Sequence, residues 1–355
     1  MELGVDSFAS AIPDPGAGPA ATAEERMAHL LEEIELADRV GLDVFGIGEH
    51  HRAEFLDSAP AVILAAAAAR TRRIRLTSAV TVLSAADPVR VFEEFATLDL
   101  LSHGRAEIVA GRGSFVEAYP LFGYRLEDYD DLFVEKLDLL LAIRARPRVR
   151  WSGKHRPPLT GQGVYPRPLQ DPLPIWVGVG GTPASFERAG TLGLPLMVAI
   201  IGGPPARFRP LVDLYREAGR AAGHRPDQLR VGLHAIGFVG PTGREAADAF
   251  FPGFARTINE IGKERGWSPT TRARLEAERG PGGAYLVGDP DEVAAKIVAV
   301  DEALGGLARV TFQMGVATIA HATMLRSIEL LGLEVVPRVR GRLGGPASGG
   351  GGPPS

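Results

Sequence analysis

The sequence predicts an α/β protein that folds as a single (β/α)8 TIM barrel, with insertions after the fourth and seventh strands. Two observations carry this prediction. Segments typical of strands and of helices alternate through eight units over almost the whole chain. The strand segments are also apolar runs without strict alternation, as in parallel strands that are buried on both faces. An open doubly wound sheet is the alternative, but eight successive units close most simply as a barrel.

Each predicted strand is a short run of mainly apolar residues bounded by turn residues. In chain order the strands are Leu3–Phe8, Val44–Ile47, Ile74–Leu83, Ala106–Ala110, Ile175–Val179, Leu196–Ile201, Val231–Val239 and Val310–Met314. Because parallel strands all end at one face of a barrel, the loops that follow them are the expected location of the functional site.

Start and stop signals define the helices between these strands. Thr22 and Glu25 have the spacing of a capping box, and Gly41 supplies the stop of the same helix. The predicted helices are Met27–Val40, Pro60–Arg70, Pro88–Leu101, Tyr129–Ala142, a helix from Thr182-Pro183, Arg207–Ala222, a long region from Gly243, Asp291–Ala303 and Ala322–Leu331. A proline-rich excursion, Pro147–Pro172, and a segment with Tyr285-Leu286-Val287-Gly288 are the expected insertions.

The composition of the chain excludes several classes of protein. The chain has 355 residues and no cysteine, which excludes disulfides and thiolate chemistry. Its net charge of −4 makes nucleic acid and anionic membranes poor partners, and no apolar run reaches the roughly 20 residues of a membrane helix. We expect a cytoplasmic protein with one barrel domain over residues 1–340 and a disordered Gly/Pro-rich tail over 341–355.

Three ionisable residues, Glu49-His50-His51, follow directly on the second apolar strand. Adjacent side chains of an extended backbone point to opposite faces, so the two histidines do not readily share one metal ion. The pattern therefore favours a proton-handling or hydrogen-bonding histidine over a metal site, and His50 is the candidate. The alternative is one buried structural histidine and one solvated histidine.

Two glycine-rich loops are candidates for binding an anion. Gly111-Arg112-Gly113 follows the fourth strand, where the glycines permit close approach to an anion and Arg112 offers a forked contact. Gly178–Ser185 joins the fifth strand to a helix start, which is a natural phosphate cradle. Together they predict one phosphorylated ligand, and the absence of G-x-G-x-x-G excludes a dinucleotide fingerprint.

At this point the chain resembles the bacterial luciferase-like flavin monooxygenases, from about Leu3 to Arg340. The order and spacing of several motifs carry the resemblance. They are Glu49-His50-His51, Thr77–Leu83, Asp87-Pro88-Val89-Arg90, Leu98–Arg105, Gly111-Arg112-Gly113, Gly181-Thr182, Gly193-Leu194-Pro195 and Leu286–Pro290.

The resemblance implies a barrel with reduced flavin mononucleotide (FMN) at its C-terminal mouth. It implies that Arg112 binds the phosphate, and that His50 matches the histidine that assists flavin–oxygen chemistry in luciferases. Gly181 stands where the family can carry Glu, so its backbone N–H is the contact. Ser78-Ala79 matches the position at which the family often has a non-proline cis peptide against the flavin ring. The expected cofactor-binding residues are Ser78, Ala79, Gly111, Arg112, Gly113, Gly180, Gly181, Thr182 and Ser185.

The resulting hypothesis is a two-component monooxygenase that uses reduced FMN and O2 on a small organic substrate. A separate flavin reductase is expected as a partner because the chain has no nicotinamide-binding fingerprint. The alternatives are a deazaflavin-dependent hydride-transfer enzyme on the same barrel, or a non-catalytic flavin-binding protein. We expect a homodimer, with the alanine-rich helix Ala59–Ala69 as a packing face. The loops Glu117–Asp128 and Gly240–Gly283 indicate no particular substrate.

Overall fold

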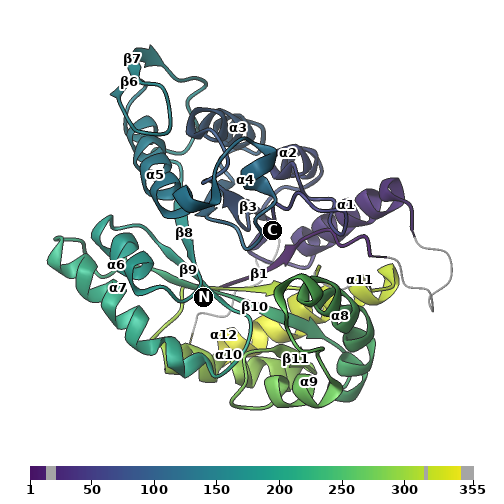
Figure 1. Ribbon diagram of the computed structural model, residues 1–355. Coiled ribbons are helices and arrows are strands. Elements are labelled where there is room, and N and C mark those ends of the chain that lie inside the picture. Colours follow the sequence, from purple (N-terminus) through teal and green to yellow (C-terminus); the bar gives the residue numbers. More distant parts are fainter. Residues whose placement is uncertain (13–20, 316–318, 345–355) are drawn as a thin grey trace, which may run out of the picture.

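Eight parallel strands close into a barrel, and helices cover its outside (Figure 1). The structure is a computed structural model that describes residues 1–12, 21–315 and 319–344. In spatial order the barrel strands are β1 (Glu2–Ser7), β2 (Val44–Ile47), β3 (Arg75–Ser78), β5 (Ala106–Gly111), β8 (Ile175–Val179), β9 (Leu196–Ile200), β10 (Val231–Val239) and β12 (Arg309–Gln313). Strand β12 pairs in parallel with both β10 and β1, which closes the barrel and confirms the predicted fold class.

The third predicted strand, Ile74–Leu83, is interrupted. After β3 the chain passes through a cis peptide bond between Ala79 and Val80, one residue later than the position expected from the resemblance. It then forms a second short strand, β4 (Thr81–Val82), which pairs with the end of β5. The side chain of Val80 points toward Gly111, where a Cβ atom would lie 2.5 Å from Val80 Cγ2. The pattern could not reveal this break, because strand-forming residues continue on both sides of it.

The helices that alternate with the strands begin and end within a few residues of the predicted positions. They are α1 (Ala23–Arg39), α2 (Pro60–Arg70), α3 (Pro88–Leu101), α5 (Tyr129–Ala145), α6 (Pro183–Thr191), α7 (Arg209–Ala221), α10 (Pro290–Leu304) and α11 (His321–Leu330). The predicted capping box is present, because Thr22 Oγ1 accepts from Glu25 N and Glu25 Oε2 accepts from Thr22 N. A 3₁₀ turn, Pro205–Phe208, takes up the predicted start of α7 at Arg207.

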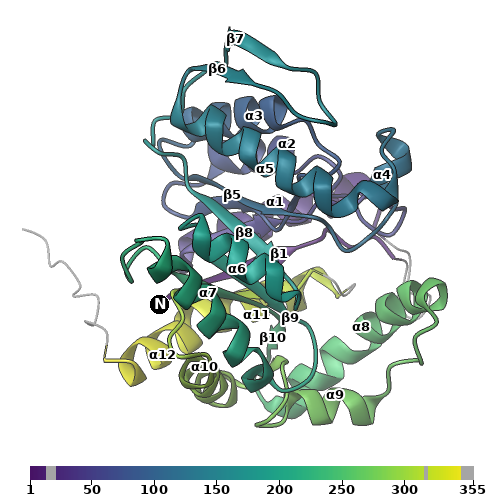
Figure 2. The same cartoon turned by 60° about the vertical axis from the view of Figure 1, so that its left-hand side comes forward.

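Both predicted insertions are found. After the fourth barrel strand, α4 (Ala118–Leu121) and a 3₁₀ turn (Leu126–Asp128) precede α5, and the proline-rich excursion forms a hairpin of β6 (Arg148–Trp151) and β7 (Leu159–Gly163). Figure 1 shows this hairpin beyond the outer end of α5. After the seventh barrel strand come α8 (Gly243–Arg265), α9 (Arg272–Arg279) and β11 (Leu286–Gly288), which pairs with β10 (Figure 2).

The C-terminal end of the barrel domain extends further than predicted. After α11 a π-helical turn, Leu331–Val335, leads into α12 (Val336–Arg342). The helix therefore includes residues 341 and 342, which the sequence assigns to the tail, and the remainder of that tail from 345 lies outside the described residues. No helix of the described ranges has the length and apolar character needed to cross a membrane.

Charged side chains fill the N-terminal end of the barrel. The fully buried Arg309 donates from Nη1 to Glu107 Oε2 at 2.7 Å and from Nε to Glu2 Oε2 at 2.8 Å. Arg75 adds an ion pair to the other oxygen of Glu107, and the Arg309 guanidinium lies 4.4 Å from the ring centroid of Trp176. Each buried charge thus has an opposite charge beside it, as burial requires. This layer closes one end of the barrel and leaves the other end for a site.

Candidate functional site

A cavity of about 610 Å³ opens at the C-terminal ends of the barrel strands. Its walls come from the ends of the barrel strands and the loops after them, together with the C-terminal part of α8. This is the face at which sites of β/α barrels lie. Of the predicted site residues, the following line the cavity: His50, Ser78, Ala79, Gly111, Arg112, Gly113, Gly180, Gly181 and Thr182.

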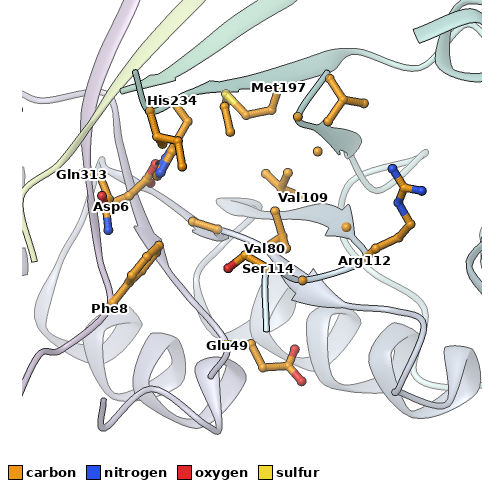
Figure 3. A pocket seen from close by; sticks show the side chains of 18 of the residues that line it. Asp6, Phe8, Glu49, Val80, Val109, Arg112, Ser114, Met197, His234 and Gln313 are labelled. Carbon is orange, nitrogen blue, oxygen red and sulfur yellow. Dashed lines mark hydrogen bonds and ion pairs between the residues drawn. The ribbon is translucent and has the colours of Figure 1, made fainter. Parts of the chain in front are cut away.

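The predicted anion site lies at one end of this cavity (Figure 3). Arg112 Nη2 donates to Ser185 Oγ at 3.1 Å, so the loop after β5 meets the first turn of α6. Ser185 is buried behind the guanidinium, while Thr182 occupies the N-cap position of α6. Within the described part of the chain the Thr182 hydroxyl caps no N–H of that first turn. Pro183 has no N–H and the Ser185 N–H donates to the Thr182 carbonyl at 3.0 Å, so the Ala184 N–H is the donor that remains for an anion.

Arg112 is held in place from two further sides. Its Nη1 forms an ion pair with Asp130, and its guanidinium lies 4.9 Å from the ring centroid of Tyr129. Arg112 therefore pairs with a carboxylate at the barrel rim and also contacts Ser185. Asp130 is 70% exposed, so water already screens its charge. The Arg112 guanidinium is thus held at the cavity wall, and its ion pair with the solvent-exposed Asp130 leaves its positive charge available to a ligand.

Sequence reasoning missed a second guanidinium near this end. Arg207 also lines the cavity, and it lies over the ring of Phe208 at 5.0 Å from the centroid. Its Nη2 donates to the carbonyl of Gly202 at 3.1 Å. In the sequence Arg207 marks a predicted helix start, but a cation in the loop after the sixth strand is also a signal of the same kind as Arg112.

An apolar surface continues from the anion site into the barrel. Val80, Val109 and Met197 lie between Arg112 and the far end of the cavity in Figure 3. A Cβ atom on Gly178 would lie 2.8 Å from Val80 Cγ1, so this glycine, like Gly111, makes room for the Val80 side chain. The result is a smooth apolar surface on which a flat ring system can lie.

His50 forms a buried pair with a carboxylate. His50 Nδ1 lies 2.8 Å from Asp57 Oδ2, and both side chains are buried. Burial raises the pKa of the Asp57 carboxyl, and the hydrogen bond from His50 opposes that rise. Three aromatic rings surround the imidazole, with centroids 4.3 Å away for Phe8, 4.8 Å for Phe55 and 5.2 Å for Phe115. With Nδ1 engaged by Asp57, Nε2 is the nitrogen left for ligand chemistry.

His51 takes a different environment, as expected for adjacent residues. Its Nε2 lies 3.3 Å from Glu49 Oε1, and its ring meets Phe122 edge to face at 4.9 Å. The other oxygen of Glu49 accepts from the backbone N–H of Val82 at 2.8 Å. Glu49 and His51 thus tie the loop after β2 to the segment after β3, while His50 belongs to the cavity wall.

A second histidine–carboxylate pair in the same cavity was also missed. His234 Nδ1 lies 2.6 Å from Asp6 Oδ2, and the Thr311 hydroxyl donates to that same oxygen. Gln313 lies beside them, and Figure 3 shows Asp6, His234 and Gln313 grouped away from Arg112. Their signal in the sequence is a polar residue inside an apolar strand, at Asp6 in Leu3–Phe8 and at His234 in Val231–Val239.

The remaining walls of the cavity are apolar. Phe115 follows β5, Ile236 comes from β10, and Ile258 and Ile261 of α8 with the following Trp267 close the cavity from the side of the second insertion. Over the described ranges there is no cluster of three His, Asp or Glu side chains that could hold a metal ion. The site therefore combines one cationic end, two histidine–carboxylate pairs and an apolar chamber.

Comparisons with known proteins identify relatives of this chain and of its fold. A family model described as luciferase-like monooxygenase matches residues 1–306. The 4-hydroxyprotoasukamycin monooxygenase of Streptomyces nodosus subsp. asukaensis is 29% identical over 334 residues, which cover 89% of this chain and 87% of that protein. The structure of the monooxygenase RslO1 from Streptomyces bottropensis has a TM-score of 0.81 at 26% identity, covering 95% of this chain and 99% of that one.

The likeness extends to barrels solved with different flavin-type cofactors. The oxygenating constituent of 3,6-diketocamphane monooxygenase from Pseudomonas putida, solved in complex with FMN, has a TM-score of 0.75 at 23% identity, over 96% of this chain and 98% of that one. F420-dependent enzymes share the fold at 18% and 19% identity. At these identities the fold is shared, and the choice of cofactor depends on the residues of the site.

Proposed function

The chain belongs to the luciferase-like monooxygenase family, and from this premise we propose that it is a two-component monooxygenase that uses reduced FMN and O2 on a small organic substrate. The observation that carries the proposal is the contact between Arg112 and Ser185 at the start of α6. It forms a phosphate-sized cationic corner at one end of a deep, mainly apolar cavity.

The residues present fit FMN. Arg112, the Thr182 and Ser185 hydroxyls and the N–H groups of Gly180 and Gly181 would hold the phosphate. The surface of Val80, Val109 and Met197 would support the ring system, because the glycines at 111 and 178 leave room for the Val80 side chain there. Reduced FMN, when bound, would supply the electrons that activate O2.

The chain contributes water exclusion and proton handling. Phe8, Phe55 and Phe115 surround the His50 imidazole, so a proton held at Nε2 exchanges little with bulk water. Asp57 fixes the tautomer that presents a free Nε2 lone pair and stabilises the imidazolium if Nε2 takes up a proton. We assign His50 the role of accepting a proton from, or hydrogen-bonding to, the group that reacts beside the flavin.

Two partners and a compartment accompany this proposal. A separate reductase supplies reduced FMN, since the sequence has no nicotinamide-binding fingerprint. A reductase of this kind draws on the reduced nicotinamide of the cytoplasm, so we assign the enzyme to that compartment. The exposed apolar side chains of α2 and α3, among them Val62 and Leu101, form the face on which we expect a second copy to pack.

A direct binding and turnover experiment tests the proposal. The protein is titrated with FMN, chemically reduced FMN and reduced F420, and O2 consumption is followed with each reduced cofactor. We expect reduced FMN to bind more tightly than F420 and to support substrate-dependent O2 consumption. Preferential binding of F420 with no O2 consumption would instead identify the deazaflavin-dependent class. Flavin binding without any turnover across a substrate panel would identify a flavin-binding protein.

A further inference from the structure

The pair formed by Asp6 and His234 joins three neighbouring strands at the end of the cavity away from Arg112. Asp6 on β1 reaches across β12 to His234 on β10, and Thr311 on β12 donates to the same carboxylate oxygen. A carboxylate accepts hydrogen bonds, so the imidazole proton lies on Nδ1. The lone pair of His234 is then on Nε2.

The Nε2 atom of His234 is available to a ligand. Among the residues that the structure describes, none is hydrogen-bonded to it, and His234 lines the cavity. The other carboxylate oxygen, Asp6 Oδ1, likewise has no hydrogen-bond partner within the described ranges, although Asp6 is 2% exposed. Asp6 therefore leaves Nε2 as an acceptor in the cavity wall, and an imidazolium formed there by proton transfer would lie beside the Asp6 carboxylate.

The cavity wall beside His234 is apolar on the side of Met197 and Phe8, has Thr311 and Gln313 as polar neighbours, and is distant from the anion site. Figure 3 shows Met197 beside His234 and Phe8 below Asp6, while Arg112 lies at the opposite side of the cavity. The ring of Phe8 is nearly parallel to that of His234, at 15° and 6.3 Å between centroids. His234 Nε2 needs a hydrogen-bond donor, and the apolar side of the wall needs an apolar contact. A hydroxyl group on an otherwise apolar molecule supplies both.

We propose that His234 is a second proton acceptor of the site and that the substrate is an apolar molecule with an acidic hydroxyl, a phenol or an enol. The O–H bond of the substrate breaks and a bond forms between its proton and Nε2, while the electron pair stays on the oxygen. Asp6 is a positioning residue, because it acts through the imidazole. This inference rests on the proposed function only in taking the cavity as the substrate site.

The test uses two probes of nearly equal shape, 4-nitrophenol and 4-nitroanisole, which lacks the hydroxyl. With the full chain, we expect 4-nitrophenol to bind about tenfold more tightly, the scale of one hydrogen bond. At a fixed pH the bound 4-nitrophenol should also show a larger fraction of the yellow phenolate than the free probe. Equal affinity for the two probes, or binding of neither, would overturn the proposal.

Variants identify the acceptor. His234→Gln and Asp6→Asn should lose both the preference and the phenolate signal, whereas a purely structural pair would change only the melting temperature. His224→Gln is the matched control, since His224, which follows α7, contacts the carbonyl of Thr191 at the end of α6. A preference that survives in His234→Gln would also contradict the assignment. If a variant fails to fold, the comparison of the two probes on the unaltered protein still decides.

The proposed cofactor is tested separately, by the quenching of FMN fluorescence on binding. Absence of FMN binding together with an intact hydroxyl preference would contradict the proposed function and leave this inference standing. FMN binding without a hydroxyl preference would contradict this inference and leave the proposed function standing.

Discussion

Gly46 lies directly against the carboxylate of Asp6: a Cβ atom at position 46 would be 2.1 Å from Asp6 Oδ1 and 2.9 Å from the Ala79 Cβ. Two residues on, a Cβ atom at Gly48 would be 2.6 Å from Asp57 Oδ2 and 2.9 Å from His50 Cε1. The two glycines of β2 and the loop after it therefore each make room for one of the two histidine–carboxylate pairs.

Gly46→Ala should destabilise the protein because the added methyl group forces the Asp6 side chain to move. We expect a loss of about 1–3 kcal/mol in the free energy of unfolding, the cost of overpacking a buried site. Gly341→Ala is the control, since nothing lies within 4 Å of a Cβ atom there and alanine favours the helix. Denaturant titration of both variants measures the difference. Equal stabilities would mean that the Asp6 carboxylate is not confined by Gly46.

Arg112→Ala should weaken FMN binding by about 1.5–3 kcal/mol, the contribution of a charge-assisted hydrogen bond. Riboflavin, which lacks the phosphate, should be affected much less. Asp130→Asn is the matched variant, because it removes the ion-pair partner but keeps the guanidinium beside Ser185. We expect it to bind FMN at least as tightly as the unaltered protein. Equal affinity of the unaltered protein for riboflavin and FMN in fluorescence titrations would show that no phosphate site exists here.

His50→Ala should leave FMN affinity nearly unchanged and reduce turnover by about 10²–10⁴-fold, the usual contribution of a proton-transfer group. His51→Ala should keep most of the turnover, because His51 contacts Glu49 and Phe122. Flavin titration, thermal melting and O2 consumption separate the two effects. Full turnover with a lowered melting temperature in the His50 variant would show that His50 only stabilises the loop.

Lys136 gives a prediction for the pH dependence of stability. Burial lowers the pKa of its amine from 10.5 to about 8, although Nζ donates to the Ser84 carbonyl at 2.6 Å and lies over the Tyr124 ring. Between these two values the unfolded chain binds more protons, so this group makes stability rise with pH there. The free energy of unfolding of Lys136→Met, measured relative to that of the unaltered protein, should therefore fall by up to about 3 kcal/mol as the pH rises between these two pKa values.

Denaturant titrations at several pH values measure this change, and Lys154→Met, with its side chain 67% exposed, gives the baseline for removal of one positive charge. A difference between Lys136→Met and the unaltered protein that stays constant with pH would contradict the lowered pKa.

Val62→Glu should convert a dimer into a monomer if α2 and α3 form the interface. Val62 is 70% exposed and Leu101 is 56% exposed, and a groove of about 630 Å³ runs between these helices, which Figures 1 and 2 both show side by side. A charge in a buried apolar interface would be uncompensated. Light scattering measures the mass, with Leu192→Glu at the C-cap of α6 as control. A monomer before any substitution would rule out the expected homodimer.

The parts of the site that could be predicted from the sequence are those with a local signal. Glu49-His50-His51 stands where an apolar strand ends, and Arg112 stands between two glycines after a strand. The Asp6–His234 pair could not be predicted in this way. The two residues are 228 positions apart in the sequence and meet only because the barrel closes. The residue pattern itself does not mark the break after Ser78; the family resemblance indicates a cis bond at Ser78-Ala79, and the structure has it one residue later, at Ala79-Val80.

The buried ion network of Arg309, Glu2 and Glu107 also bears on the cavity, because Arg309 is one of the residues that line it. The two carboxylates already neutralise this guanidinium, so a ligand that reached it would meet no unpaired positive charge. The arrangement thereby directs an anionic group to Arg112, whose partner Asp130 is exposed to solvent, and away from Arg309.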